Sequence, residues 1–255
     1  MKTSILIVSW LQDLHWLEYC LRSIDKFARG FHETVILVPH QEVEEFKKHR
    51  PSGTRLVTYP RVSDKAKWHL HHQAMKCHAD QWCPTADFIL HMDSDCVFSE
   101  PVRPDDYFVD GKPVMLIEPY KNLVNNPWQE PTQKALKRHV EWECMRRHPQ
   151  VNPAEVYVGL REHMHQLHNM TLEAYILSRK SDFPWGVSEH NLIGAYAYEY
   201  HRNLYHWIDV SRQPRPHSKL IQFWSHSPPD KPQEMPNKEH GNYGTPIEML
   251  RAIGL

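Results

Sequence analysis

The first half of the chain alternates short apolar runs with longer polar or amphipathic stretches. Four apolar runs predict buried strands: Ile5–Ser9, Thr34–Val38, Arg55–Tyr59 and Phe88–Met92. The stretches between them predict helices: Asp13–Phe27, Gln41–His49 and Ser63–Trp82. This repeated alternation predicts an α/β fold with a doubly wound, mostly parallel sheet. Ligands of such sheets bind at the carboxyl ends of the strands.

The pattern changes after a fifth predicted strand at Val114–Glu118. Three later stretches predict helices: Pro127–Arg147, Pro153–His168 and Glu189–Tyr200. Leu172–Leu177 fits a strand or a short helix, and Leu220–Trp224 is a short apolar run followed by a proline-rich, polar segment that predicts a tail or lid. No internal repeat or flexible linker interrupts the chain, so we expect one domain, 1–255, with two functional halves.

Composition and charge narrow the classes of protein. The chain has 255 residues, of which 40% are hydrophobic, and a net charge of −1 with a sequence pI of about 7.1. The chain has no overall excess of positive charge, although a local stripe of basic residues could still bind nucleic acid. The five cysteines form no CxxC pair, which favours a reducing, cytoplasmic compartment. No apolar run is long enough for a signal peptide or a transmembrane segment.

Two carboxylates, Asp93 and Asp95, directly follow the fourth predicted strand. Residues i and i+2 of an extended chain point the same way, so the pair forms a compact, oxygen-rich site. Such a site suits a divalent cation that holds a diphosphate. An acidic turn is one alternative. A haloacid-dehalogenase-like phosphatase with Asp93 as covalent nucleophile is another, but its motif normally follows the first strand of the domain, whereas three strand–helix units come first here.

The loop after the first predicted strand reads Ser9-Trp10-Leu11-Gln12-Asp13. A polar loop with an aromatic ring at this place is expected to bind the base and ribose of a nucleoside. The usual glycine fingerprint, GxGxxG, is missing from the chain. Asp13 fits a helix N-cap equally well.

The helix predicted before the Asp pair is rich in basic and polar residues: Lys65, Trp68, His69, His72, Gln73 and Lys76. Positions 65, 69, 72 and 76 share one helical face. This face is expected to reach nucleotide phosphates or a sugar, and a solvated helix face is the alternative.

A second group of candidates lies near the start of the helix predicted at 189–200. Trp185 and Gly186 provide a flat ring and a bare backbone, which suit a sugar. Ser188 fits a helix cap and places Glu189 in the first turn, where the helix dipole favours a carboxylate. Glu189 is therefore a candidate general base, with an ordinary helix-start glutamate as the alternative. His226 could bind a metal as a neutral imidazole, or be structural.

Taken in order, these motifs resemble those of the GT-A glycosyltransferases. The chain is similar to small bacterial and phage members that carry a WxxQQ-like helix and a late SExxLxG segment. Here the corresponding stretches are Trp68–Gln73 and Ser188–Gly194. The resemblance is firmest over residues 1–118 and 184–226, and the middle of the chain matches no motif known to us.

The resemblance implies a GT-A fold, with residues 1–118 as the nucleotide-sugar-binding half and residues 119–255 as the acceptor half. It also implies a nucleotide-sugar donor, usually a uridine diphosphate sugar, and Mn²⁺ or Mg²⁺ as cofactor. The positions implied to bind the donor are Ser9, Trp10, Asp13, Lys65, Trp68, His72, Gln73, Asp93, Ser94, Trp185 and Gly186. Since His72-Gln73 stands where relatives have two glutamines, the base or sugar preference is expected to differ.

The resemblance also implies roles for the charged residues. Asp95 would bind the metal directly, and Asp93 would hold the donor ribose or sugar, or the metal through water. His226 would be a further metal ligand. Glu189 matches the catalytic base of inverting members, which deprotonates the acceptor hydroxyl as it attacks the anomeric carbon.

The acceptor is open, and a glycan is one candidate. A hydroxymethylated base in phage DNA is another, which would place the protein in the host cytoplasm. Basic residues interleaved with aromatics can hold a phosphate backbone and a flipped base. The middle segment has this composition: Trp128, Lys134, Lys137, Arg138, Trp142, Arg146, Arg147 and Arg161. A non-catalytic module that binds a nucleotide sugar is a further alternative.

Overall fold

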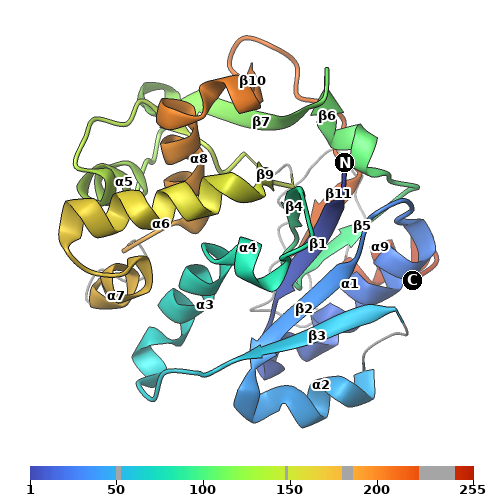
Figure 1. Cartoon of the computed structure of the whole chain (residues 1–255). Coiled ribbons are helices and arrows are strands. Elements are labelled where there is room, and N and C mark those ends of the chain that lie inside the picture. The colour runs from blue at the N-terminus through green and yellow to red at the C-terminus, as the bar shows by residue number, and fades with distance from the viewer. Residues whose placement is uncertain (50–52, 147–148, 180–185, 224–244) are drawn as a thin grey trace.

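The computed structural model describes residues 1–49, 53–146, 149–179, 186–223 and 245–255 (Figure 1). Within them, a central sheet has the strand order β3-β2-β1-β4-β9. Its strands are β3 (Thr54–Tyr59), β2 (Thr34–Pro39), β1 (Thr3–Val8), β4 (Phe88–His91) and β9 (Val151–Pro153). The first four are parallel, and β9 is antiparallel to β4. The expected mostly parallel α/β sheet is confirmed.

The apolar runs of the sequence become strands that are buried on both faces, as parallel strands require. On β1, Leu6 and Val8 pack in one core cluster, whereas Ile5 and Ile7 pack in the other. The first cluster includes residues of α3 (Trp68–Lys76), α4 (Ala79–Trp82), α6 (Ala154–His168), α7 (Leu172–Ser178) and α8 (Glu189–Tyr200). The second includes residues of α1 (Leu14–Phe27) and α2 (Val43–His49). Helices therefore cover both faces of the sheet (Figure 1).

The strand order reverses beside β1. After β1 the chain moves to β2 and β3 on one side, and then crosses back to place β4 on the other side of β1. In open α/β sheets, the crevice at such a switch point is where ligands bind. The segments that follow β1 and β4 contain Trp10, Asp13, Asp93 and Asp95, so the fold brings two predicted motifs to one edge.

Two of the predicted helices are shorter than expected. The stretch Ser63–Trp82 is divided into a 3-10 turn at Lys65–Lys67 followed by α3 and α4. At the break between the two helices, the Arg161 guanidinium donates to the Cys77 carbonyl at 3.2 Å and to Asp80 at 2.6 Å. Because Arg161 comes from a distant helix, the prediction of one continuous helix was wrong for a tertiary reason.

The predicted helix Pro127–Arg147 was also wrong in extent. Only α5 (Gln129–Leu136) forms, and Lys137 ends it in the left-handed conformation with φ 49°. The chain then forms β8 (Trp142–Glu143), which pairs with β7 (Lys112–Pro119). Leu172–Leu177, which fitted two types of element, is helical as part of α7.

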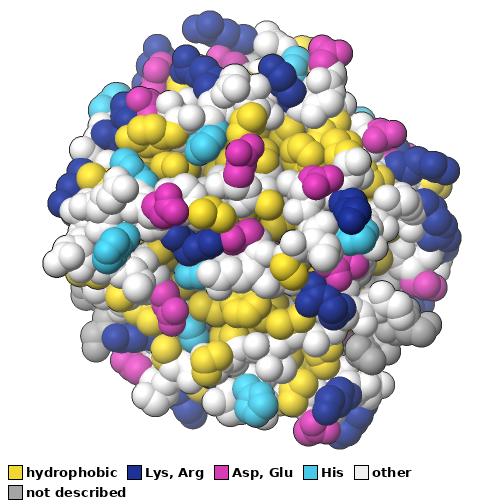
Figure 2. Space-filling view, in the orientation of Figure 1, with side chains coloured by type: hydrophobic (Ala, Val, Ile, Leu, Met, Phe, Trp, Pro, Cys, Tyr) yellow, Lys and Arg dark blue, Asp and Glu magenta, His cyan; other side chains and the backbone are white. Residues whose placement is uncertain are grey.

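Two smaller sheets complete the described part of the fold. β7 pairs with β6 (Phe108–Val109) and β10 (His206–Asp209), while β11 (Leu220–Gln222) pairs antiparallel with β5 (Cys96–Phe98). The chain ends after α9 (Pro246–Ala252). Among the described residues, no helix is both long and apolar enough to cross a bilayer. Lys and Arg are interspersed with Asp and Glu over the face shown in Figure 2.

Candidate functional site

A cavity of about 360 Å³ opens at the switch point of the sheet. Several of the predicted residues line it together: Trp10, Asp13, His72, Gln73, Asp93, Ser94, Asp95 and Glu189. They come from the loops after β1 and β4, from α3 and from the start of α8. The volume lies within the range of about 300–1,000 Å³ that is usual for small-molecule sites. The structure thus gathers motifs that are scattered along the sequence.

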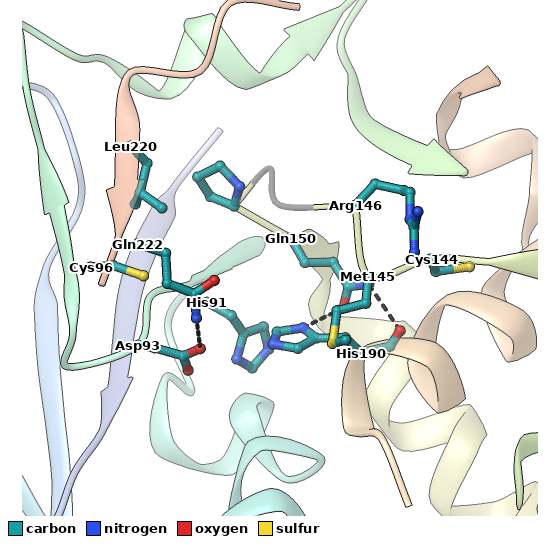
Figure 3. A pocket seen from close by; sticks show the side chains of 11 residues that line it. His91, Asp93, Cys96, Cys144, Met145, Arg146, Gln150, His190, Leu220 and Gln222 are labelled. Atoms are coloured by element: carbon teal, nitrogen blue, oxygen red, sulfur yellow. Dashed lines mark hydrogen bonds between the residues drawn. The ribbon is translucent and has the colours of Figure 1, made fainter. Parts of the chain in front are cut away.

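A second, smaller cavity of about 90 Å³ lies next to the first, and the two share Asp93, Met145 and His190 as walls. Figure 3 shows the His91 and His190 rings beside each other, with Asp93 and Gln222 on one side and Met145 on the other. Gln222 Nε2 donates to Asp93 Oδ2 at 3.4 Å. Burial of the His91 ring lowers its pKa to about 3, so the ring is neutral.

Lys76 joins the two predicted carboxylate sites. Its buried ammonium donates to Asp93 Oδ1 at 2.6 Å and to Glu189 Oε1 at 2.7 Å. Burial alone would raise the pKa of both carboxyls and lower that of the lysine. The attraction between the opposite charges outweighs burial, so the pKa values of Asp93 and Glu189 lie below their usual range and that of Lys76 lies above it. All three groups are therefore charged at neutral pH.

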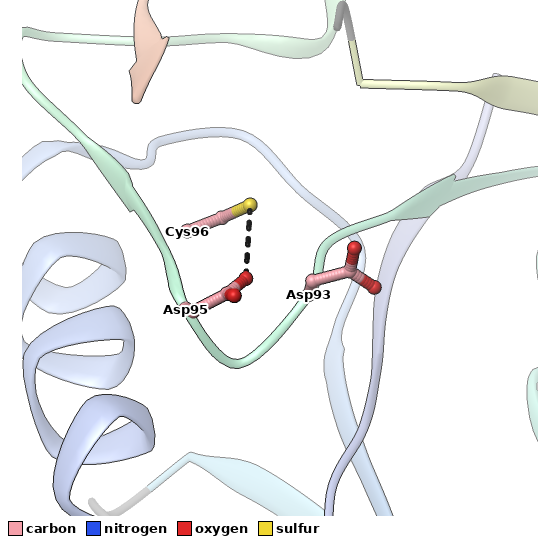
Figure 4. A group of neighbouring side chains, drawn as sticks. All are labelled: Asp93, Asp95 and Cys96. Atoms are coloured by element: carbon pink, nitrogen blue, oxygen red, sulfur yellow. Dashed lines mark hydrogen bonds between the residues drawn. The ribbon is translucent and has the colours of Figure 1, made fainter. Parts of the chain in front are cut away.

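Asp93, Asp95 and Cys96 offer ligand atoms that lie within 4.8 Å of one another (Figure 4). Burial, reinforced by the neighbouring carboxylates, raises the pKa of the Cys96 thiol well above its usual value. A protonated thiol is a poor metal ligand, so the group offers mainly carboxylate oxygens. This donor set fits Mg²⁺ or Mn²⁺ better than a soft metal. Phe223 N donates to the Asp95 carbonyl at 2.8 Å and holds this turn.

The loop after β1 is tied to the same turn. The Asp13 carboxylate accepts hydrogen bonds from Trp10 Nε1 at 2.8 Å and from Ser94 Oγ at 3.2 Å. Asp13 occupies the N-cap position of α1, but its side chain makes no capping hydrogen bond. Trp10 also meets the edge of His72, with ring centroids 5.7 Å apart. The aromatic ring and the Asp pair are thereby held on the same cavity.

Glu189 is positioned by the start of α8. Ser188 Oγ accepts from Asn191 N at 3.3 Å, so the expected helix cap is confirmed. Gln73 Nε2 donates to the Val187 carbonyl at 3.0 Å and thus joins α3 to this helix start. His190 Nε2 lies 3.6 Å from Glu189 Oε1. These contacts direct the carboxylate into the cavity.

Other predicted residues lie elsewhere. Lys65 and Trp68 do not line the cavity: Trp68 packs under the Arg61 guanidinium, 4.0 Å from the ring centroid, and its Nε1 donates to the Val62 carbonyl. Ser9 is fully buried, and its backbone N donates to the Leu37 carbonyl. Gly186 is buried just before α8. Trp185 and His226 lie outside the described residues.

Three of the other wall residues had no predicted site role: Met145, His190 and Gln222. His69 and Lys76, which the helical spacing had placed on the face expected to reach nucleotide phosphates or a sugar, both line the larger cavity. His190 is the direct neighbour of Glu189. Trp128, which the sequence placed in the basic and aromatic middle segment, also lines the larger cavity. Met145 and Gln222 carry no local signal, because only the tertiary fold brings their segments to the cavity.

Fold and site together define an α/β protein with a mostly parallel, Rossmann-like sheet and a carboxylate-lined cavity at its switch point. The chain belongs to a family of unknown function, DUF6492, whose profile matches residues 8–222. A comparison with curated proteins finds no match. The matched span runs from the end of β1 to the end of β11 and includes every residue named above as lining the two cavities.

Proposed function

We propose that this protein is a GT-A glycosyltransferase that moves a sugar from a nucleoside diphosphate sugar to an acceptor hydroxyl. The observation that carries the proposal is the convergence of Asp93, Asp95 and Glu189 on one cavity at the switch point of the sheet. Asp93 and Asp95 suit the divalent cation that accompanies the donor diphosphate. Glu189 suits the general base that takes the proton of the acceptor hydroxyl. We expect the donor to be a uridine diphosphate sugar.

On the donor side, Asp95 and Asp93 would hold Mn²⁺ or Mg²⁺. The bound cation would neutralise charge on the diphosphate as a Lewis acid. Lys76 adds a fixed positive charge to the wall of the same cavity. Trp10, Asp13 and His72 form an aromatic and polar wall that suits the base and ribose. This division leaves Glu189, on the other side of Lys76, for the acceptor.

Glu189 is an ionised carboxylate and can accept the proton of the acceptor hydroxyl. Its contact with Lys76 lowers its pKa and so weakens it as a base. The role therefore requires Lys76 to interact less with Glu189 when donor and acceptor are bound. The bond between the anomeric carbon and the acceptor oxygen forms as the bond to the diphosphate breaks.

A phosphatase with Asp93 as nucleophile is the second candidate. One observation favours it, namely that the Lys76 ammonium lies 2.6 Å from Asp93, where it would steady a nucleophilic carboxylate. The two functions differ in the bond that breaks. The phosphatase releases inorganic phosphate from simple phosphate esters, whereas the glycosyltransferase releases a nucleoside diphosphate from a sugar donor.

A donor-hydrolysis screen tests the proposal. The protein is incubated with Mn²⁺ and a panel of nucleoside diphosphate sugars, and free nucleoside diphosphate is quantified. We expect turnover of at least one donor, a loss of about 100-fold or more in Asp95→Asn, and an unchanged rate in Asp105→Asn, which alters an exposed aspartate outside both cavities. Phosphate release from p-nitrophenyl phosphate without donor turnover would favour the phosphatase.

Glu189→Gln separates an enzyme from a binding module. This variant is expected to retain binding of uridine diphosphate with Mn²⁺, measured by calorimetry, and to lose turnover. A wild-type protein that binds the donor without any turnover, even with acceptors present, would support the non-catalytic module instead.

For the acceptor, the basic residues of the middle segment are largely neutralised. Lys134 pairs with Glu130, Arg138 with Glu199 and Arg161 with Asp80: these contacts measure 2.7, 2.6 and 2.6 Å. Arg146 contacts both Glu118 and Glu143. A glycan acceptor therefore fits this surface better than nucleic acid does.

A further inference from the structure

A third cavity lies in the second half of the chain, and the proposed function does not use it. It measures about 240 Å³ and lies between the segment around β8 and the last part of α8. Its walls are formed mainly by aromatic and charged side chains: Arg138, Glu141, Trp142, Tyr198, Glu199 and Arg202. None of these residues lines either of the cavities described above. Part of the basic and aromatic middle segment therefore builds a separate site.

Two aromatic rings form the apolar part of this wall. The Trp142 and Tyr198 ring centroids lie 5.8 Å apart, and both side chains are half-buried. Two neighbours hold Tyr198 in place: Trp207 packs against it edge-on with centroids 4.9 Å apart, and the Arg202 guanidinium lies 3.8 Å from its centroid. Aromatic rings that are fixed by packing and still partly open to solvent suit the apolar C–H face of a sugar ring.

The two arginines and two glutamates of the wall balance one another in charge. Arg138 pairs with Glu199 at 2.6 Å, and the exposed Glu141 and Arg202 add one charge of each sign. Carboxylates accept hydrogen bonds and guanidinium groups donate them, so the wall can serve hydroxyl groups in both ways. Because the charges balance, the wall does not attract a polyanion. This chemistry suits an uncharged ligand with many hydroxyl groups.

The size of the third cavity restricts the ligand further. Its volume of about 240 Å³ is smaller than the 360 Å³ of the cavity at the switch point. It also falls just below the roughly 300 Å³ at which small-molecule sites usually begin. The third cavity therefore suits one sugar residue of a longer glycan better than a whole nucleotide sugar.

Helix α8 and the segment beside it connect the third cavity to the reacting carboxylate. α8 begins at Glu189 and reaches Tyr198 after about 14 Å, since an α-helix rises 1.5 Å per residue. The neighbouring segment runs the opposite way. Trp142 lies beside Tyr198 at one end, and at the other end Cys144 N donates to Asn191 Oδ1 at 2.8 Å, close to Glu189. The third cavity is thus separated from Glu189 by a distance that a short oligosaccharide can span.

We propose that the third cavity is a remote acceptor subsite, which binds one sugar residue of an uncharged glycan while another residue of the same glycan reaches Glu189. Sugar binding is inferred from the cavity itself, whereas the role as an acceptor subsite rests on the proposed glycosyl transfer. No bond forms or breaks in this cavity, which only holds and aligns the glycan. Because two sites then hold one molecule, oligosaccharides are better acceptors than single sugars.

The first test needs neither donor nor metal. Protein that contains 5-fluorotryptophan is titrated with four neutral tetrasaccharides, namely maltotetraose, cellotetraose, mannotetraose and chitotetraose, and is followed by ¹⁹F NMR. The signal that disappears in Trp142→Phe reports on the third cavity and is expected to shift with at least one tetrasaccharide. The signal of Trp82, which lines none of the three cavities, is expected to stay in place. A Trp142 signal that no tetrasaccharide moves would overturn the subsite.

Two exposed wall residues provide variants that leave the core intact. Glu141→Gln is expected to raise the dissociation constant of the bound tetrasaccharide about fivefold, because a hydrogen bond to a charged group becomes one between neutral groups. Arg202→Gln should act in the same direction. Glu130→Gln, at an exposed position of α5 outside the three cavities, is the matched control and should keep the wild-type affinity. An affinity that neither Glu141→Gln nor Arg202→Gln lowers would also overturn the subsite.

The second test compares acceptors of different length. With Mn²⁺ and a donor that the wild type hydrolyses, KM is measured for the tetrasaccharide that binds and for the methyl glycoside of the same sugar. The wild type is expected to have a KM about tenfold or more lower for the tetrasaccharide. Glu141→Gln should raise only that KM, about fivefold, and leave kcat, the KM of the methyl glycoside and donor hydrolysis unchanged.

The two proposals can fail separately. Equal KM values for the two acceptors in the wild type would overturn the remote subsite and leave the proposed glycosyl transfer intact. If no donor is turned over, the proposed function fails, and the ¹⁹F titration still decides whether the third cavity binds a sugar.

Discussion

At the scale of single residues, Lys76 neutralises two carboxylates that come from different parts of the chain. Asp93 is 17 positions away in the sequence, and Glu189 is 113 positions away. The motifs around both acids could be recognised in the sequence, because each follows a local pattern. The ion pairs between them could not be predicted, since they depend on how α3 packs against β4 and α8.

Removing the Lys76 charge should destabilise the protein. Lys76→Met leaves the buried Glu189 carboxylate and the half-buried Asp93 carboxylate without their cation. Breaking a buried pair costs about 3–5 kcal/mol. Lys47→Met, which breaks an exposed pair with Glu44, should cost less than about 1 kcal/mol. Guanidinium unfolding at pH 7 measures both. A free energy of unfolding in Lys76→Met as high as in Lys47→Met would contradict this account of the three charges.

His72 should make stability depend on pH. Burial lowers its pKa from 6.5 to about 3, so the folded state keeps the ring neutral where the unfolded chain would protonate it. The stability from this neutral ring is present above pH 6.5 and is lost as the pH falls from 6.5 towards 3. Between pH 7.5 and 5, the wild type should lose about 1–2 kcal/mol more than His72→Phe.

Unfolding at the two pH values provides the measurement, and His165→Phe, at an exposed position of α6, provides the control. The control should follow the wild-type pH dependence. If His72→Phe follows it too, the His72 ring is not held neutral by burial.

At the scale of elements, α8 determines how the acceptor side of the site is built. Its first residue is Glu189, and the Asn191 side-chain amide near its start contacts the Glu143 carboxylate of β8. Further along, α8 passes close to the segment that contains Cys144 and Met145. Ser188 determines where α8 starts, and Gly194 allows the close approach to Cys144, so each feature can be tested by a single substitution.

The N-cap of α8 should matter for stability and for activity. Ser188→Ala removes the acceptor for Asn191 N and is expected to cost about 1 kcal/mol. Thr171→Ala removes the corresponding cap of α7, where Ala174 N donates to Thr171 Oγ1 at 3.1 Å, and should cost a similar amount. Only Ser188→Ala is expected to reduce donor turnover, because only Ser188 adjoins Glu189. Equal donor turnover in the two variants would show that the α8 cap does not affect the activity of the site.

Gly194 should be sensitive to a single methyl group. A Cβ at this position would lie 2.5 Å from Cys144 Cβ and 2.6 Å from its Sγ. Gly194→Ala must therefore push away the segment that includes Met145, and we expect a loss of about 1–3 kcal/mol with weaker donor binding. At Gly159 of α6, an added Cβ meets the end of the Tyr196 side chain, which can shift.

Thermal unfolding and calorimetry with uridine diphosphate and Mn²⁺ measure these effects. Gly159→Ala is the matched glycine-to-alanine control and should leave nucleotide binding unchanged. A Gly194→Ala protein with wild-type stability and binding would show that α8 can move away from Cys144 at little cost.

At the scale of the whole molecule, the sequence predicted the parallel core but not how the second half joins it. Repeated apolar runs indicated β1 to β4, because strands buried on both faces need such runs. β9 is only three residues long, yet it enters the central sheet beside β4 from the half that was expected to bind the acceptor. Nothing in so short a segment distinguishes a strand from a loop.

The charge distribution leads to a prediction about nucleic acid. With a net charge of −1 and most basic residues of the middle segment paired, the protein should bind duplex DNA only weakly, at about 0.1 mM or weaker at 150 mM salt. Fluorescence anisotropy with plain and hydroxymethylcytosine duplexes measures this affinity. A micromolar dissociation constant for a duplex, with an affinity that falls steeply as salt rises, would instead support DNA as the acceptor.

The pairing of β5 with β11 has a consequence for biosynthesis. β5 follows Asp95 directly, and its partner strand β11 comes much later in the sequence, where Phe223 also donates to the Asp95 carbonyl. Because a ribosome makes the N-terminal part first, β1 to β4 can assemble while β11 is still to be translated. The turn that carries the two aspartates would then reach its final form only after β11 has been made. A chain released before β11 is made would have the parallel sheet, but the turn with Asp93 and Asp95 would lack the strand that holds it.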